Sequence, residues 1–192
     1  MRYSQIKKEQ LIDFFILAAR FLLGFTFIRY GYSKLVEGQF GITAHELETP
    51  LKDLDIFRVS WYLFDFQPFK AIIGASQLLC GVLLIINRSS LMGAFLFLPI
   101  VFTIFLIDLT YMPPDLKTGF IWRLSWYILL DLLIFWHHRD RVKKIWQSVW
   151  AGMGTKFKYA PWLYFVAVFL SLLLEFAPVL PRAAFEVLGR IF

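Results

Sequence analysis

Ionisable side chains stand inside long apolar stretches of this 192-residue chain, and they are the residues whose types could do chemistry. A charge at membrane depth costs roughly 2.5–3.5 kcal/mol on insertion scales, so such groups usually face the interior of a helical bundle. There they pair, relay protons or bind ligands. The candidate buried polar or functional residues are Arg20, Arg29, Lys34, Gln77, Asp108, Arg123, Asp131 and Glu175. Nothing in the sequence marks one of them as catalytic.

Helical rise places most of these residues in two groups. Arg20 comes out ~14 Å into the first apolar stretch and Asp131 ~10 Å from the same side of the membrane, so the two could pair. The plainer interpretation is a structural ion pair that fixes the register of two helices. The second group, in the outer third of the membrane, is Arg29, Asp108, Arg123 and Glu175, with Lys34 just beyond.

The outer group comes from several different apolar stretches, which is how a helical bundle builds a pocket. Arg29 lies ~180° around the helix from Arg20, so the two point at different sites unless the helix is surrounded. Arg29 could also simply extend to the lipid headgroups. Gln77 lies near mid-membrane, where it could hydrogen-bond across helices. A kink at Pro99 could open a cavity or be tolerated packing.

The composition indicates that lipid is the solvent for most of the chain. Hydrophobic residues make up 59% and charged residues 18%, against about 45–50% and about 25% in soluble domains. The net charge of +6 resembles that of nucleic-acid-binding proteins. However, the basic residues cluster at the ends of apolar stretches, as in membrane proteins, so we expect no nucleic-acid partner.

The apolar stretches predict an all-α membrane protein whose environment is the lipid bilayer. They cover about 11–32, 69–86, 91–109, 120–136 and 161–180, each close to the ~20 residues that span a bilayer. We expect one membrane domain over 1–192, with a four-helix core (11–138), a basic cytoplasmic segment (139–159) and a fifth span (160–181).

Charge placement predicts the orientation. The tail, the 87–90 turn and the 137–159 segment are basic, whereas the 33–68 loop is rich in acids. The positive-inside rule then puts the N-terminus in the cytoplasm and the C-terminus outside, in a bacterial inner membrane. If the fifth stretch is a surface helix instead, the C-terminus stays inside.

Two connecting segments should form short helices. Thr43 and Glu46 have the spacing of a capping box, and Thr49-Pro50 could begin a second helix. We expect this loop to lie on the outer surface and cap the bundle, with an amphipathic connector as the alternative. Apolar residues at helical spacing among lysines in 142–150 predict an inner interfacial helix held by anionic lipid.

Several chemistries are not supported. Cys80 is the only cysteine, so the chain alone cannot run a dithiol relay. His45, His137 and His138 fall in a loop or at a helix end, which does not suit haem. We expect no metal site, although His45 beside two glutamates could bind a metal weakly. Phosphate-binding loops, nucleophile elbows and HExxH are not found.

Glycines at fixed spacing mark the face on which the first helix should pack. Arg20, Gly24, Phe27, Gly31 and Lys34 share one face of that helix. Small residues let a neighbouring backbone approach closely in membranes. We expect the helix-packing residues to be Gly24, Gly31, Gly74 and Gly81.

This pattern, followed by an acidic loop, resembles the DoxX family of small membrane proteins. The stretch 73–84, the short turn with Arg88 and the start of the next stretch at 91–94 extend the likeness, which covers 19–138. Gln77 falls where many members have a glutamate.

The resemblance implies a redox association. Some DoxX relatives are described as membrane subunits of quinone-linked oxidoreductases, and others as partners of redox-stress enzymes. We therefore expect an accessory or anchor subunit that could contact quinone, a soluble redox partner or further copies of itself, rather than a stand-alone enzyme. A small-solute or proton-coupled transporter and a non-catalytic membrane scaffold are the alternatives.

Overall fold

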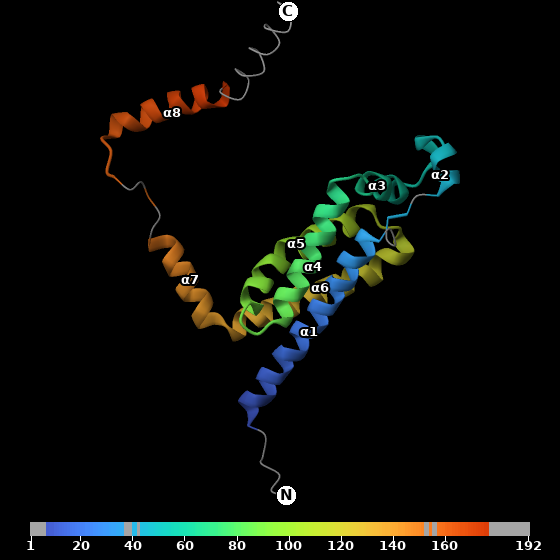
Figure 1. The fold of residues 1–192 in the computed structure, drawn as a ribbon, viewed down its shortest axis with the longest axis horizontal. Helices are drawn as coiled ribbons and strands as arrows, with labels where there is room; N and C mark the ends of the chain where they lie inside the picture. The colour runs from blue at the N-terminus through green and yellow to red at the C-terminus, as the bar shows by residue number, and fades with distance from the viewer. Residues whose placement is uncertain (1–6, 37–39, 42, 152–153, 155–156, 177–192) are drawn as a thin grey trace, which may run out of the picture. The chain divides into compact units, whose positions relative to one another are not determined.

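The computed structural model describes residues 7–36, 40–41, 43–151, 154 and 157–176. These residues are almost entirely helical, and no strand occurs among them (Figure 1). In chain order the elements are α1 (Lys8–Leu35), α2 (Ala44–Glu48), the 3-10 helix η1 (Leu51–Asp53), α3 (Ile56–Phe64), α4 (Phe69–Ile85), α5 (Ser90–Tyr111), α6 (Pro114–His137), α7 (Arg139–Ala151) and α8 (Pro161–Phe176).

Three helices, α1, α5 and α6, are long and apolar enough to cross a membrane. A fourth crossing is formed if α3 and α4, bent by 82° at their junction, count as one broken span. The chain is thus an all-helical integral membrane protein. Within the described residues α8 has 16 residues, about 24 Å at helical rise. The end of the predicted fifth span lies outside the described residues, so that crossing stays a prediction.

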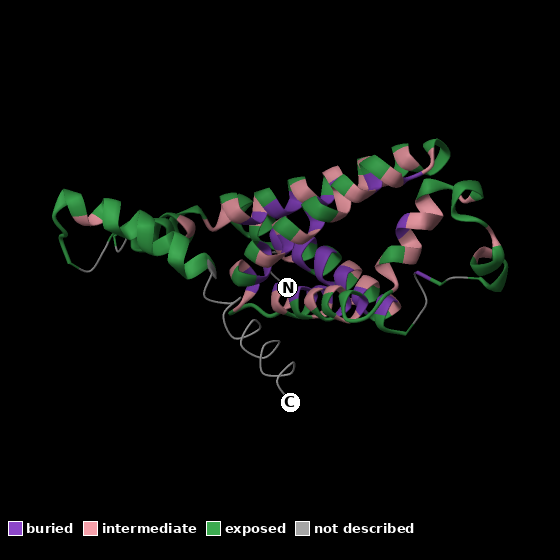
Figure 2. Cartoon of the chain, turned by 90° about the horizontal axis from the view of Figure 1, so that it is seen from above, coloured by how far each residue is buried: buried purple, intermediate pink, exposed green. Residues whose placement is uncertain are grey.

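The chain divides into two compact units, 1–145 and 146–192. In the first, α1 packs mainly on α4, while α5 packs on both α4 and α6. The buried faces of these four helices meet in one core (Figure 2). Its fully enclosed side chains include Leu23, Phe27, Leu84 and Phe97. We call the end with the 86–89 turn the turn end, and the end with α3 the loop end.

Two reciprocal glycine pairs hold α1 and α4 together. A Cβ on Gly24 would lie 2.9 Å from the carbonyl oxygen of Gly81, and one on Gly81 would lie 2.6 Å from that of Gly24. Likewise a Cβ on Gly31 would lie 2.5 Å from the Gly74 carbonyl oxygen. Because both partners are backbone, neither can yield, so these positions require glycine for the close helix contact.

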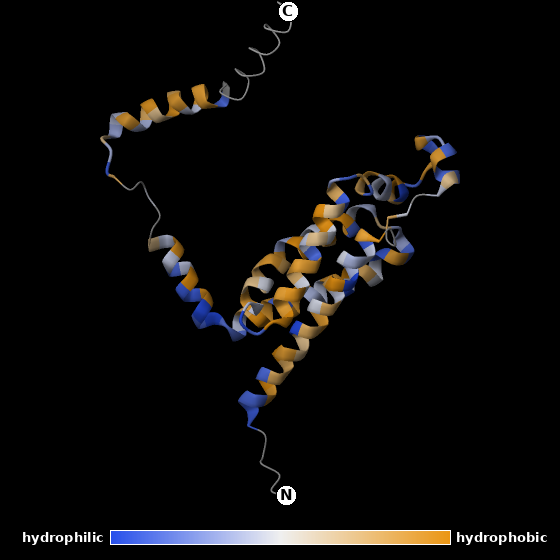
Figure 3. Cartoon of the chain, in the orientation of Figure 1, coloured by the Kyte–Doolittle hydropathy of each residue, from blue (hydrophilic) through white to orange (hydrophobic). Residues whose placement is uncertain are grey.

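The outside of the first unit is apolar. Large side chains on α1 and α6 face away from the core, with Phe25 60% and Trp122 75% exposed. Hydropathy colouring shows hydrophobic residues along much of the bundle helices (Figure 3). In water such a surface would be unfavourable, whereas hydrocarbon chains solvate it.

The loop before α4 contains the predicted capping box. The Thr43 hydroxyl accepts from the Glu46 backbone N–H at 3.3 Å, and the Glu46 carboxylate accepts from the Thr43 N–H at 2.8 Å. Arg58 of α3 pairs with Glu46. This hydrogen bond from Arg58, followed by those from Thr43, lowers the pKa of Glu46 from 4.5 to about 2.

Three predictions about helix positions can be compared with the structure. The segment after Thr49-Pro50 is a single 3-10 turn. The last core helix starts at Pro114, six residues before the predicted start, because proline suits a first helical turn. The predicted basic helix is α7, which buries no residue.

Candidate functional site

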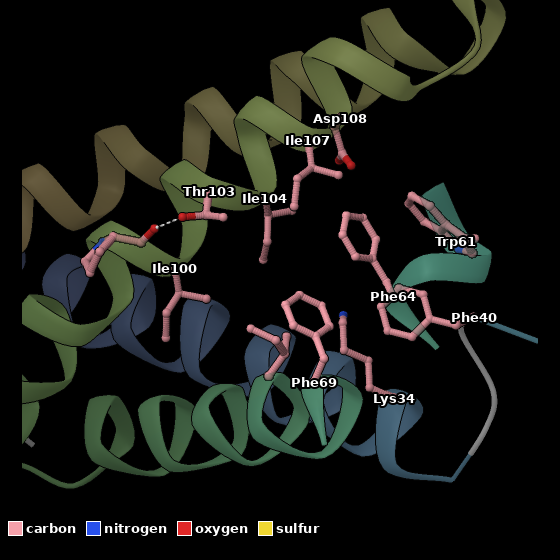
Figure 4. Close-up of a pocket in the computed structure, with 12 residues that line it drawn as sticks. Lys34, Phe40, Trp61, Phe64, Phe69, Ile100, Thr103, Ile104, Ile107 and Asp108 are labelled. Atoms are coloured by element: carbon pink, nitrogen blue, oxygen red, sulfur yellow. Dashed lines mark hydrogen bonds between the residues drawn. The ribbon is translucent and has the colours of Figure 1, made fainter. Parts of the chain in front are cut away.

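A cavity of about 250 Å³ lies at the loop end. We call it the aromatic cavity (Figure 4). Its walls are mostly aromatic and aliphatic, with one cation and one acid. They consist of Lys34, Phe40, Trp61, Phe64, Phe69, Ile73, Pro99, Ile100, Thr103, Ile104, Ile107 and Asp108. The helices α1, α3, α4 and α5, together with Phe40, therefore build one apolar chamber.

The bend between α3 and α4 positions the aromatic wall. Phe64 near the end of α3 stacks on Phe69 at the start of α4, with ring centroids 5.4 Å apart. Phe40 packs edge-on against Trp61 at 5.8 Å. On the opposite wall Pro99 lines the cavity from α5. Its carbonyl oxygen accepts a hydrogen bond from the Thr103 hydroxyl at 2.8 Å.

Lys34 and Asp108 are the charged residues of this cavity, and both are about 95% buried, with 5% of their surface exposed. The Lys34 ammonium lies 5.3 Å from the centre of the Phe40 ring and 5.7 Å from that of Tyr30. Figure 4 shows it pointing between the aromatic rings, with Asp108 entering from α5. A buried hydrogen-bond donor thus faces an apolar chamber that suits a flat ring with polar substituents.

A second cavity of about 370 Å³, the cationic cavity, shares Lys34, Trp61, Ile104 and Asp108 with the first. Its remaining walls are Arg29, Tyr30, Phe57, Met112, Leu116, Phe120, Arg123 and Leu124. Three cations thus face one acid, and Asp108 interacts electrostatically with both Arg123 and Lys34. That excess of positive charge favours an anionic ligand.

Arg123 packs on an aromatic ring but has an unused hydrogen-bond donor among the described residues. Its guanidinium lies over the Phe120 ring, 4.5 Å from the ring centre. Its buried Nε has no hydrogen-bond partner in the part of the chain that the structure describes. A buried donor without an acceptor costs about 1–3 kcal/mol, so an acceptor bound in this cavity would be stabilised.

The predicted outer group is therefore brought together with one exception. Arg29, Lys34, Asp108 and Arg123 all line the cationic cavity. Arg29 is also exposed. Glu175 lies on α8 in the second unit, where it is exposed, and the structure does not place it with the others.

The Arg20–Asp131 pair is not formed. Arg20 donates instead to the carbonyl oxygens of Leu84 and Ile85, at 2.9 and 3.0 Å, and to Asn87 Oδ1 at 2.9 Å. The last carbonyls of a helix lack partners within the helix, and a cation near them interacts favourably with the helix dipole. Arg20 thus caps the C-terminus of α4, a role that depth counting could not reveal.

Asp131 and Gln77 lie in the centre of the bundle, both with no exposed surface. Both carboxylate oxygens of Asp131 and both amide atoms of Gln77 lack hydrogen-bond partners among the described residues. Cys80, one helical turn from Gln77, contacts the Gly93 carbonyl oxygen at 3.5 Å. Polar groups without partners in a core are rare and point to a functional or water-bound role.

Sequence reasoning missed the aromatic wall. The spacing of Phe57, Trp61 and Phe64 is that of one helix face, and this signal could have placed them together. What the sequence could not show is the bend that turns this face over the bundle. In the described ranges, no group of three His, Cys, Asp or Glu side chains could hold a metal ion.

Comparison with known proteins gives a limited likeness. No family model matches the chain, and no solved structure matches it. The chain is 37% identical over 90 residues to the uncharacterized protein YwoB of Bacillus subtilis (strain 168). The match covers 46% of this chain and 57% of YwoB, so the chain spans somewhat more than half the length of that relative.

Proposed function

We propose that this integral membrane protein is DoxX-like and serves as an accessory or anchor subunit linked to redox chemistry, with a quinone headgroup in the aromatic cavity. The observation that carries the proposal is the buried Lys34 facing an aromatic chamber. The resemblance rests on the sequence pattern that includes Gly24, Gly31, Gly74 and Gly81, through which α1 and α4 pack.

The aromatic cavity fits a quinone ring in size and chemistry. Pockets for drug-sized ligands measure about 300–1,000 Å³, so a cavity of about 250 Å³ accommodates a ring and excludes most of a long tail. Phe64 and Phe69 offer faces for stacking, and the Lys34 ammonium can donate a hydrogen bond to a ring carbonyl. A bound quinone would supply two-electron chemistry, while these residues orient its ring and exclude water.

The test compares two tryptophan substitutions on one helix. Thr103 lines the aromatic cavity, whereas Thr110 does not, yet both are exposed and donate to the carbonyl oxygen four residues earlier. We expect T103W to lower binding of a short-chain quinone more than tenfold, about 1.4 kcal/mol, and T110W to leave it unchanged. The protein is purified in mild detergent, and both retained and added quinone are quantified.

The proposal fails if the purified protein retains no quinone and binds none. It also fails if both tryptophan variants behave alike. In cells, deletion that leaves respiratory and thiol-stress phenotypes unchanged would remove the redox role, even where binding is found.

A transporter of a small anionic solute is the second candidate. The three cations of the cationic cavity favour it, as do the buried Gln77 and Asp131 without described partners. Flux into liposomes should then require charge at membrane depth. Flux that survives neutralisation of the three cavity cations, Arg29, Lys34 and Arg123, together would overturn this candidate.

The orientation belongs to the same proposal. Basic residues gather at the turn end and in α7, which favours a cytoplasmic N-terminus in a bacterial cytoplasmic membrane. Five crossings would put the C-terminus outside. Of two reporters fused after Phe192, one active only outside the cytoplasm and one active only inside it, we expect the first to be active. Activity of the second would exclude the fifth span.

A further inference from the structure

A third hollow, at the turn end, is distinct from both cavities described above. It measures about 620 Å³ and lies between the start of α5 and the start of α7. We call it the basic groove. Its lining residues are Arg88, Leu91, Met92, Phe95, Arg141, Lys144 and Ile145, all in the first unit.

The charge of the basic groove is one-sided. Arg88 comes from the turn between α4 and α5, and Arg141 and Lys144 come from α7. The aromatic and cationic cavities each contain Asp108 among their walls, but no acid is among the residues lining this groove. The nearest acid in sequence is Asp140, which is exposed beside Arg141. Three cations that line one groove favour a phosphate group.

The other half of the groove is apolar and belongs to a membrane-spanning helix. Leu91, Met92 and Phe95 occupy the first two turns of α5. Met92 is 60% exposed and Phe95 43% exposed. The Phe95 ring is held edge-on against Phe135 of α6, with centroids 4.8 Å apart, so this wall is firmly placed.

The two halves together select the occupant. A soluble acidic peptide would satisfy the cations and leave the apolar wall on α5 uncovered at the level where that helix enters the membrane. An anionic lipid satisfies both, because its phosphate lies at the headgroup level and its acyl chains run along the helix. We propose that the basic groove binds one anionic glycerophospholipid, with its phosphate against Arg88, Arg141 and Lys144 and a chain along Met92 and Phe95.

Native mass spectrometry of the full chain in mild detergent tests this proposal with added phosphatidylglycerol or phosphatidylcholine. Each basic residue near an anionic surface contributes about 1 kcal/mol, or about 5-fold in affinity. We therefore expect R88Q and R141Q each to weaken phosphatidylglycerol binding about 5-fold and the double variant about 30-fold. Phosphatidylcholine binding should be weaker than that of phosphatidylglycerol in the wild-type protein.

Arg139→Gln is the matched control, because Arg139 is exposed on the same helix and does not line the groove. It should leave binding within about 2-fold of wild type. Equal loss in R139Q and R141Q would show diffuse attraction and overturn the site, as would equal affinity for the two lipids. Tighter binding of a soluble acidic peptide than of phosphatidylglycerol in the same experiment would also overturn the proposal.

A second readout does not depend on variants. A phosphatidylglycerol with a photoreactive acyl chain should label the peptide that contains Met92 and Phe95. Labelling spread evenly over the apolar faces of α1 and α6 would contradict the proposal. Neither experiment contains quinone, so failure here leaves the proposed redox function unaffected, and failure of quinone binding leaves this site unaffected.

Discussion

The Arg20 guanidinium in α1 donates to the Leu84 carbonyl oxygen in α4, 2.9 Å away and 64 residues later in the chain. Arg20 also donates to the Ile85 carbonyl oxygen and to Asn87. A charged group within an apolar stretch thereby caps the C-terminus of a neighbouring helix. Its role is structural, and stability measurements can examine it directly.

Arg20→Leu should destabilise the bundle by about 2–4 kcal/mol, because it removes charge-assisted hydrogen bonds and leaves the last carbonyls of α4 unpaired. Arg29→Leu, on the same helix but exposed, should change stability by less than about 0.5 kcal/mol. Unfolding in mixed detergent micelles measures both. Equal stability of the two variants would contradict the capping role.

Gly31→Ala should destabilise the protein by about 1–3 kcal/mol, because overpacking forces the helix backbones apart. The added Cβ would lie 2.5 Å from the Gly74 carbonyl oxygen. Gly119→Ala is the control, since a Cβ there meets nothing within 4 Å. That change should be neutral or stabilising because alanine favours helix. If G31A unfolds like wild type, the close contact between α1 and α4 does not stabilise the protein.

Asp131 and Arg20 should act independently. A double-mutant cycle with Arg20→Gln and Asp131→Asn should give a coupling energy below about 0.5 kcal/mol, as for residues that share no partner. Thermal or detergent unfolding of the four proteins provides the measurement. A coupling energy above about 1 kcal/mol would restore the ion pair expected from depth counting.

The loop before α4 should lose stability in acid. The folded pKa of Glu46, about 2, lies below its ordinary value of 4.5. A depressed pKa contributes stability that is fully present above about 4.5 and is lost as pH falls through about 2. Carbon-13 NMR of the Glu46 carboxyl should show the low midpoint.

Arg58→Gln should raise that midpoint toward 4.5, because Arg58 is the largest cause of the shift. Glu48→Gln, which leaves the pair between Arg58 and Glu46 intact, is the control. A midpoint near 4.5 in the wild-type protein would exclude the capping-box pairing in solution.

Local patterns in the sequence predict the parts of this protein that depend on local physics. Apolar stretches predict the bundle, and the Thr43–Glu46 spacing predicts the capping box. The outer group is predictable because helical rise places Arg29, Lys34 and Asp108 at similar depths along their apolar stretches, and all three line one cavity. Depth is readable from helical rise alone.

Contacts that depend on how helices meet could not be predicted in this way. Helical rise gives the depth of a residue in the membrane but not its angle around the bundle. It therefore predicts that Arg20 can pair with Asp131, whereas Arg20 donates its hydrogen bonds to the carbonyls at the end of α4. Likewise the sequence does not reveal the bend between α3 and α4, beside which Trp61 and Phe64 line the aromatic cavity.

The reciprocal glycine pairs have a consequence for the reach of α1. Gly24 meets Gly81 and Gly31 meets Gly74, so both pairs are seven residues apart on antiparallel helices. The two close contacts fix the register of α1 along α4. Arg20 and Lys34 lie just beyond the two glycines of α1. Arg20 caps the end of α4, and Lys34 lines the cavities. A helix turns about 100° per residue. Moving one glycine by a single residue would therefore rotate one end of α1 relative to α4, so that either Arg20 or Lys34 kept its position and the other lost it. The separation between the Arg20 cap on α4 and the aromatic cavity is thus fixed by a whole number of residues along α1.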